Sequence, residues 1–128
     1  MSKIDRSFRI GDIIFTKNES ERKFNVFKIL RIENWRDGSD TWHVLWYTPL
    51  SNPPKVDDLK SLTIMALHAP VTSLAATAEF ITNIPVAPEE LAGYFTYLKQ
   101  TNFSKYLEET GQDANVIIQQ AQNYFRNW

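Results

Sequence analysis

Residues 24 to 48 constrain the fold of this chain more than any other stretch. Two runs rich in β-branched and aromatic residues flank Asp37-Gly38. An Asp-Gly pair between such runs is the strongest short-range signal for a β-hairpin, because its residues suit the tight turn that joins two antiparallel strands. We therefore predict two long strands that reverse at Asp37-Gly38.

The position of the turn predicts the pairing of these strands. With Asp37 and Gly38 as a two-residue loop, Ile29 is expected opposite Trp46, and Glu33 opposite Trp42. One face of the hairpin then carries Phe27, Ile29, Arg31, Glu33, Trp35, Trp42, Val44 and Trp46. The other face carries Val26, Lys28, Leu30, Ile32, His43, Leu45 and Tyr47. Both faces are largely apolar, which favours a curved sheet or small barrel, or a layer of helices behind the sheet.

Further strands are expected on both sides of the hairpin. Residues 8–16 predict a first strand in which Gly11 marks a bulge or a close approach of the backbone, followed by a solvated turn at 17–23. The prolines in 48–54 end the hairpin, and Asp57-Asp58-Leu59 predicts a short helical turn. Alternation over 62–67 predicts a fourth strand that ends at His68-Ala69-Pro70, and 80–84 predicts a short fifth strand.

The last third of the chain has helical signals. Pro88 suits a first helical position, and Glu89 and Glu90 complement the helix dipole. Residues 102–110 predict a second helix that Gly111 ends, and Asp113 begins a strongly amphipathic third. We therefore predict one α+β domain over residues 1–128. Its curved, mostly antiparallel sheet of four or five strands, over about 8–84, packs against two or three helices over 86–128.

Composition and missing motifs exclude several classes of protein. The chain has no cysteine, which rules out disulfides and thiolate chemistry and favours the cytoplasm. Its net charge of −1 argues against non-specific grip on duplex DNA. Pro70 and His68 interrupt the uncharged stretch 61–78, so a membrane span is not expected. The sequence also lacks catalytic, phosphate-binding and cofactor-binding motifs, and it predicts neither a cofactor nor an enzymatic activity.

His43 and His68 are the only two histidines. Any imidazole chemistry must use one of them, as a base or as a metal ligand. Neither lies in a supporting motif, and no metal-ligand spacing joins them. A structural or solvated role is therefore favoured for each. An enzymatic role would require a pocket with a second polar group within hydrogen-bond reach of one imidazole.

The clustered aromatic residues are the better indication of function. Most of these rings are expected in the core, since Trp and Tyr dominate buried area in small domains. The exposed remainder favours a non-catalytic module that binds a protein partner. The alternative is single-stranded nucleic acid stacked on aromatic rings beside cations. The candidate binding residues here are Trp35, Trp42, Trp46, Tyr47, Arg31 and Arg36.

The amphipathic stripe of the terminal helix is a second candidate binding surface. Tyr124 and Trp128 lie on this stripe, and the chain finishes on Asn127-Trp128 without a helix stop signal. Two interpretations remain open. Either Trp128 packs back onto the sheet, or the chain is part of a larger protein and this helix contacts a further segment of that protein.

Overall fold

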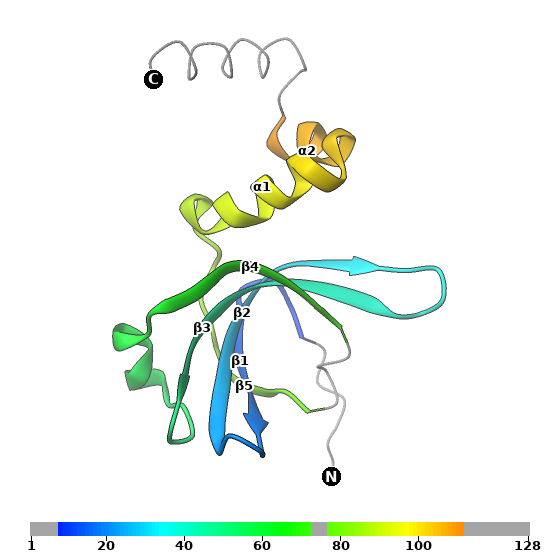
Figure 1. Cartoon of the computed structure of the whole chain (residues 1–128). Coiled ribbons are helices and arrows are strands. Elements are labelled where there is room, and N and C mark those ends of the chain that lie inside the picture. Colours follow the sequence, from blue (N-terminus) through cyan, green and yellow to red (C-terminus); the bar gives the residue numbers. More distant parts are fainter. Residues whose placement is uncertain (1–7, 73–76, 112–128) are drawn as a thin grey trace. The chain divides into compact units, whose positions relative to one another are not determined.

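The computed structural model describes residues 8–72 and 77–111, and Figure 1 shows the order of its elements. The strands are β1 (Asp12–Asn18), β2 (Lys23–Asn34), β3 (Asp40–Leu50), β4 (Ile64–Thr72) and β5 (Glu79–Asn83). The helices are the 3₁₀ turns η1 (Val56–Ser61) and η2 (Pro88–Leu91) and the α-helices α1 (Ala92–Thr101) and α2 (Phe103–Thr110). All strand pairs are antiparallel, in the order β4-β3-β2-β1-β5. This open, curved sheet followed by helices confirms the predicted α+β class.

Two compact units divide the chain, Met1–Tyr94 and Phe95–Trp128. The first holds the sheet, both 3₁₀ turns and the first turn of α1. The described part of the second holds the rest of α1 and all of α2, where the rings of Phe95 and Phe103 pack against Tyr106. Gly111 ends α2 at φ +66°, as predicted for the helical segment 102–110. The side chain of Asn102 caps the start of this helix. The helix predicted from Asp113 onward lies outside the described residues.

The central hairpin forms where predicted, but its strands pair in a different register from the one that we predicted. Ile29 pairs with Val44 rather than Trp46, and Glu33 pairs with Thr41 rather than Trp42. The reason is the loop, in which Trp35 N donates to Ser39 O (2.8 Å) and Gly38 N donates to Trp35 O (3.0 Å). This is a three-residue loop whose glycine takes a positive φ (+90°), not the two-residue turn that we assumed.

A bulge in β2 changes the predicted faces. The register shifts between Ile29 and Arg31, so Ile32 shares a face with Trp42, and Arg31 shares the opposite face with His43. Our assignment of Arg31, Glu33 and Trp35 to the face of Val44 and Trp46 is therefore wrong, as is that of Ile32 to the face of His43. One extra residue reverses every side chain that comes after it, because side chains alternate along a strand.

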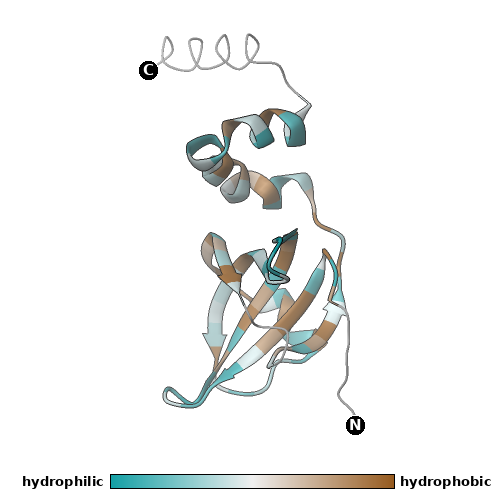
Figure 2. Cartoon of the chain, turned by 90° about the vertical axis from the view of Figure 1, so that its right-hand side faces the viewer, coloured by the Kyte–Doolittle hydropathy of each residue, from teal (hydrophilic) through white to brown (hydrophobic). Residues whose placement is uncertain are grey.

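Both faces of the sheet are buried over its centre, as the apolar pattern predicted. One face carries a core of Ile14, Phe27, Ile29, Trp42 and Val44. Figure 2 shows hydrophobic stretches along the strands. The opposite face buries Ile13, Val26, Leu45 and His43, and Tyr94 from the first turn of α1 lies against His43 at a ring-centroid distance of 4.9 Å.

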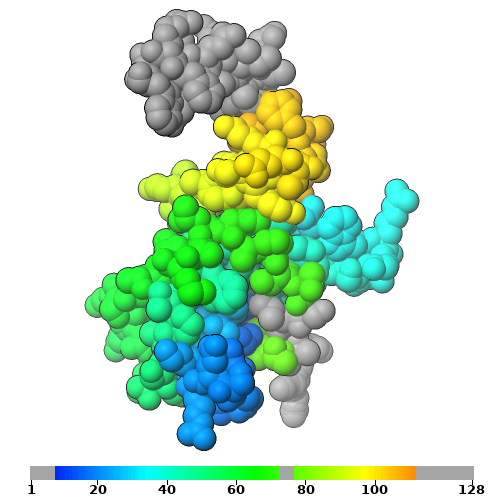
Figure 3. Space-filling model, in the orientation of Figure 1, coloured from blue at the N-terminus to red at the C-terminus, as the bar shows by residue number. Residues whose placement is uncertain are grey.

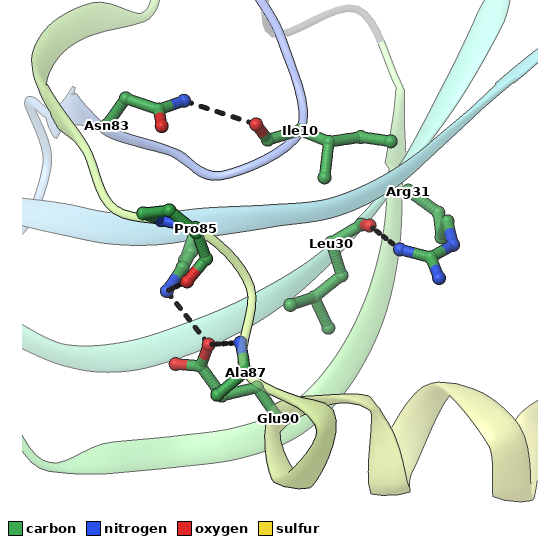
Figure 4. Close-up of polar contacts among 8 residues, drawn as sticks. Ile10, Leu30, Arg31, Asn83, Pro85, Ala87 and Glu90 are labelled. Carbon is green, nitrogen blue, oxygen red and sulfur yellow. Dashed lines mark hydrogen bonds and ion pairs between the residues drawn. The ribbon is translucent and has the colours of Figure 1, made fainter.

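The first strand begins later than predicted, at Asp12 rather than residue 8. Gly11 precedes it at φ +93°, where an added Cβ would lie 3.0 Å from Ile84 O, so the predicted close approach is confirmed. The buried Asp12 carboxylate accepts hydrogen bonds from Arg9 N (2.9 Å) and Asn83 Nδ2 (2.8 Å). Asn83 also donates to Ile10 O, as Figure 4 shows. These contacts satisfy a carboxylate that would be costly to bury alone.

The fourth strand does not end at His68-Ala69-Pro70 but continues to Thr72. Pro70 pairs with His43 on β3, and β4 is an edge strand of the sheet. An edge strand tolerates proline where the missing N–H would face away from the sheet. The prediction treated proline as a strand terminator, but proline interrupts a strand only where its missing N–H would be needed for a hydrogen bond to the neighbouring strand.

Gly93 allows the first turn of α1 to approach β4. An added Cβ would lie 2.8 Å from both Leu67 O and Leu67 Cβ, closer than real Cβ atoms come. We expect Gly93→Ala to destabilise the fold by about 1–3 kcal/mol, because the neighbour is backbone and must move. Urea denaturation measures this cost. Gly38→Ala is the contrasting variant, since nothing lies within 4 Å of Gly38 and only its positive φ opposes the change. Equal stability of Gly93→Ala and wild type would contradict this close packing.

Candidate functional site

Of the predicted site residues that the structure describes, the exposed ones lie at the tip of the β2–β3 hairpin. Trp35 is 52% exposed, and its indole Nε1 donates to Thr41 Oγ1 at 2.9 Å. Asp37 accepts hydrogen bonds from both the backbone N (2.9 Å) and the hydroxyl (2.6 Å) of Ser39. These bonds lower the pKa of the Asp37 carboxyl. The loop is therefore internally braced, and it presents a fixed indole to solvent.

The shape of the tip adds to this exposed ring. Figures 1 and 3 show the hairpin projecting from the sheet. An open hollow of about 630 Å³ lies at its tip. Its lining residues are Trp35, Arg36, Asp37, Ser39, Thr41 and Thr72. An aromatic ring, a guanidinium and a carboxylate thus share one small surface.

The other predicted aromatics do not join this surface. Trp42 is 4% exposed in the core, where Phe8 packs edge-on against it, and its Nε1 donates to Asp40 (3.3 Å). Trp46 packs on Phe27 at a centroid distance of 5.4 Å, on the same face as Trp42. Tyr47 lies on the opposite face and is half-buried. Tyr124 and Trp128 lie outside the described residues.

Arg31 is also separated from Trp42 and Trp46. It lies beyond the β2 bulge on the opposite face of the sheet, with its Cζ 5.8 Å from the centroid of the Tyr94 ring. Its Nη1 donates to Leu30 O at 2.8 Å, as Figure 4 shows. The single aromatic and basic face that the sequence suggested is therefore divided between the two faces of the sheet and the hairpin tip.

A chain of three polar side chains crosses the sheet where the sequence indicated only isolated histidines. His43 Nε2 lies 2.6 Å from Glu33 Oε1, and His43 Nδ1 lies 2.8 Å from His68 Nε2. His43 is fully buried, whereas the Glu33 side chain is 25% exposed. The centroids of the imidazole rings are 5.0 Å apart and their planes differ by 16°. Given the short N–N distance, the rings meet edge to edge.

Two bulges bring these groups together. The β2 bulge turns Glu33 to the face of His43, and a second register shift, between the pairs Val44–Ala69 and Trp46–Ala66, lies beside His68 on β4. Bulges commonly re-aim side chains in this way. Sequence alternation carries no signal for either bulge, so the cluster was not predictable from strand periodicity.

The surroundings of the three hydrogen-bonded side chains disfavour a positive charge on His68. Burial, and then the electrostatic effect of His43, lowers the pKa of His68 from 6.5 to about 4. The ring of Tyr94 lies 5.9 Å from that of His68. The polar partners of His43 satisfy one condition for acid–base chemistry, a second polar group within hydrogen-bond reach. The other condition is a pocket beside the imidazole, and the hollow described above lies at the hairpin tip instead. Within residues 8–72 and 77–111, no group of three His, Cys, Asp or Glu side chains is arranged to hold a metal ion.

A buried ion pair lies on the same face of the sheet. Lys28 is 3% exposed, and its Nζ contacts Glu90 Oε1 at 2.8 Å and Pro85 O at 3.2 Å. Glu90 also accepts from Ala87 N at 2.8 Å, at the start of η2 (Figure 4). Burial, followed by the charge of Glu90, raises the pKa of Tyr47 to about 12. Lys28 therefore fastens η2 to the sheet instead of contributing a cation to a binding face.

Comparison with known proteins finds no matching family model, and no curated protein or solved structure with detectable similarity. Among the helices of the described residues, none is long and apolar enough to cross a membrane. The function is therefore inferred from the geometry of the chain's own residues.

Proposed function

We propose that this chain is a non-catalytic protein-interaction module that binds its partner through the hairpin tip, with Trp35 as the anchor and Arg36 beside it. One observation carries the proposal. The Trp35 ring is half exposed, yet its N–H is hydrogen-bonded to Thr41, so the indole is held outside the core in a defined position.

The chemistry of the tip favours a protein ligand. Trp and Arg are the residues most often found to dominate protein interfaces. A ring that is already fixed loses little conformational freedom on binding, which lowers the entropic cost of association. Arg36 and Asp37 place opposite charges at the rim, where they suit a polypeptide of mixed charge better than a polyanion.

Single-stranded nucleic acid is the less favoured partner. Stacking of successive bases requires several accessible rings along a basic groove. Of the residues suggested for that role, Trp42 lies in the core and Arg31 on the opposite face from it, which leaves Trp35 and Arg36 at the tip. For the location of the protein we propose the cytoplasm, which the lack of cysteine supports.

Selection of peptide ligands from a displayed random library, with the full chain as bait, tests the proposal. Affinities of the selected peptides are then measured by calorimetry for wild type, Trp35→Ala and Phe103→Ala. Loss of an anchoring ring costs about 2 kcal/mol, so we expect about 30-fold weaker binding to Trp35→Ala. Phe103→Ala removes a ring of similar exposure (42%) from the other unit and is expected to leave affinity unchanged.

Peptides that bind Trp35→Ala as tightly as wild type would place the binding surface elsewhere and contradict the proposal. A parallel titration with oligothymidine at low salt distinguishes the alternative. Quenching of tryptophan fluorescence that Trp35→Ala abolishes and added salt reverses would favour nucleic acid.

A further inference from the structure

The hydrogen bonds of the Glu33–His43–His68 chain fix the positions of its protons. A carboxylate accepts hydrogen bonds, so His43 Nε2 carries a hydrogen toward Glu33. A neutral His43 then has its lone pair on Nδ1, and His68 donates to it from Nε2. In this state every bond in the chain has one donor and one acceptor.

One added proton keeps the same bonds. A proton taken up at Nδ1 of His68 allows the Nε2 hydrogen to pass to Nδ1 of His43. His43 is then an imidazolium between the Glu33 carboxylate and a neutral His68, and it donates from both ring nitrogens. The positive charge lies beside the carboxylate that compensates it.

A second proton cannot be accommodated in this way. Both His43 Nδ1 and His68 Nε2 would then carry hydrogens that point at each other across 2.8 Å. The two rings would also be cations with centroids 5.0 Å apart. The hydrogen bond between the His43 and His68 side chains, which links β3 to β4, must therefore break.

We propose that Glu33, His43 and His68 form a proton-operated junction that holds β4 on β3, accepts one proton with its bonds intact, and opens when it takes up the second. Among the described residues, the groups that face the histidine pair include Glu33 and Arg31 from β2 and Tyr94 from α1. The Lys28–Glu90 pair lies on the same face of the sheet. Arg31 adds a permanent positive charge near Tyr94, which further disfavours a second cation. The junction is independent of any partner at the hairpin tip.

The junction accepts only one proton with its hydrogen bonds intact, and the low pKa of His68, about 4 against 6.5 for an exposed imidazole, agrees with this. The unfolded chain binds this proton at higher pH than the folded chain does. The junction's contribution to stability is therefore complete above pH 6.5 and is lost progressively as the pH falls through about 4.

Nuclear magnetic resonance of the uniformly ¹⁵N-labelled wild-type chain tests the junction directly. We expect a scalar coupling through the hydrogen bond between His43 Nδ1 and His68 Nε2 near neutral pH. The coupling should survive uptake of the first proton and vanish with the second, as the pH falls through about 4. Loss of the coupling at the first proton, its persistence with both rings charged, or its absence at neutral pH would overturn the proposal.

His68→Gln gives an independent test, because glutamine keeps a donor toward His43 but cannot take up a proton. We expect the folding equilibrium constant of wild type to fall at least about tenfold more than that of His68→Gln as the pH drops from 6.5 to 4. Equal pH dependence of the two chains would contradict the junction. The coupling in wild type decides the matter if His68→Gln fails to fold.

Discussion

Replacing Trp42 by alanine is expected to destabilise the fold by about 3–5 kcal/mol, the usual cost of removing a large aromatic side chain from a core. The indole is 4% exposed and packs with Ile14, Phe27, Ile29 and Val44. Its removal leaves a cavity in this core, which the surrounding side chains can only partly fill. Urea denaturation followed by far-ultraviolet circular dichroism measures the change in the free energy of unfolding.

Trp35→Ala is the matched control, because it removes the same atoms from the same hairpin. The Trp35 ring is 52% exposed and has one hydrogen bond, to Thr41, so the expected loss is under about 1 kcal/mol. A comparable loss of unfolding free energy in both variants would contradict the placement of Trp42 in the core and Trp35 at the exposed tip. The same pair separates stability from binding, since Trp35→Ala is expected to lose ligand and keep its fold.

Removing the partner of a buried lysine is expected to have the second largest effect. Glu90→Ala leaves the Lys28 ammonium, 3% exposed, with Pro85 O as its remaining contact in the described structure. We expect a loss of about 3 kcal/mol, at the low end for a broken buried pair because the Glu90 side chain is 26% exposed. Thermal unfolding and urea denaturation measure this loss.

Two further variants identify the cause of that loss. Glu89→Ala removes an exposed neighbouring carboxylate at the start of the same helical turn and is expected to change stability by less than about 0.5 kcal/mol. The double variant Lys28→Met, Glu90→Leu replaces the pair with apolar side chains and is expected to recover most of the stability. A double variant as unstable as Glu90→Ala would show that other contacts of Glu90, such as its hydrogen bond from Ala87 N, explain the loss rather than an unpaired charge on Lys28.

Local signals in the sequence were sufficient to predict most of the secondary structure. Asp37-Gly38 located the hairpin, because few residue pairs allow such a reversal. Pro88 and Gly111 marked the start of η2 and the end of α2 through their fixed or permissive backbone angles. The main errors, at the start of β1 and the end of β4, came from a glycine and a proline whose effect depends on neighbouring strands.

The sequence by itself determined that this chain forms an antiparallel hairpin and sheet followed by helices, because turn chemistry and apolar periodicity act over a few residues. Only the tertiary structure decided which side chains meet. A bulge of one residue in β2 moved Arg31 and Glu33 away from Trp42 and Trp46 and placed Glu33 beside His43. A register shift between β3 and β4 accompanies His68 on that face. Such bulges depend on how neighbouring strands pack and pair, so no local pattern in this sequence predicted them.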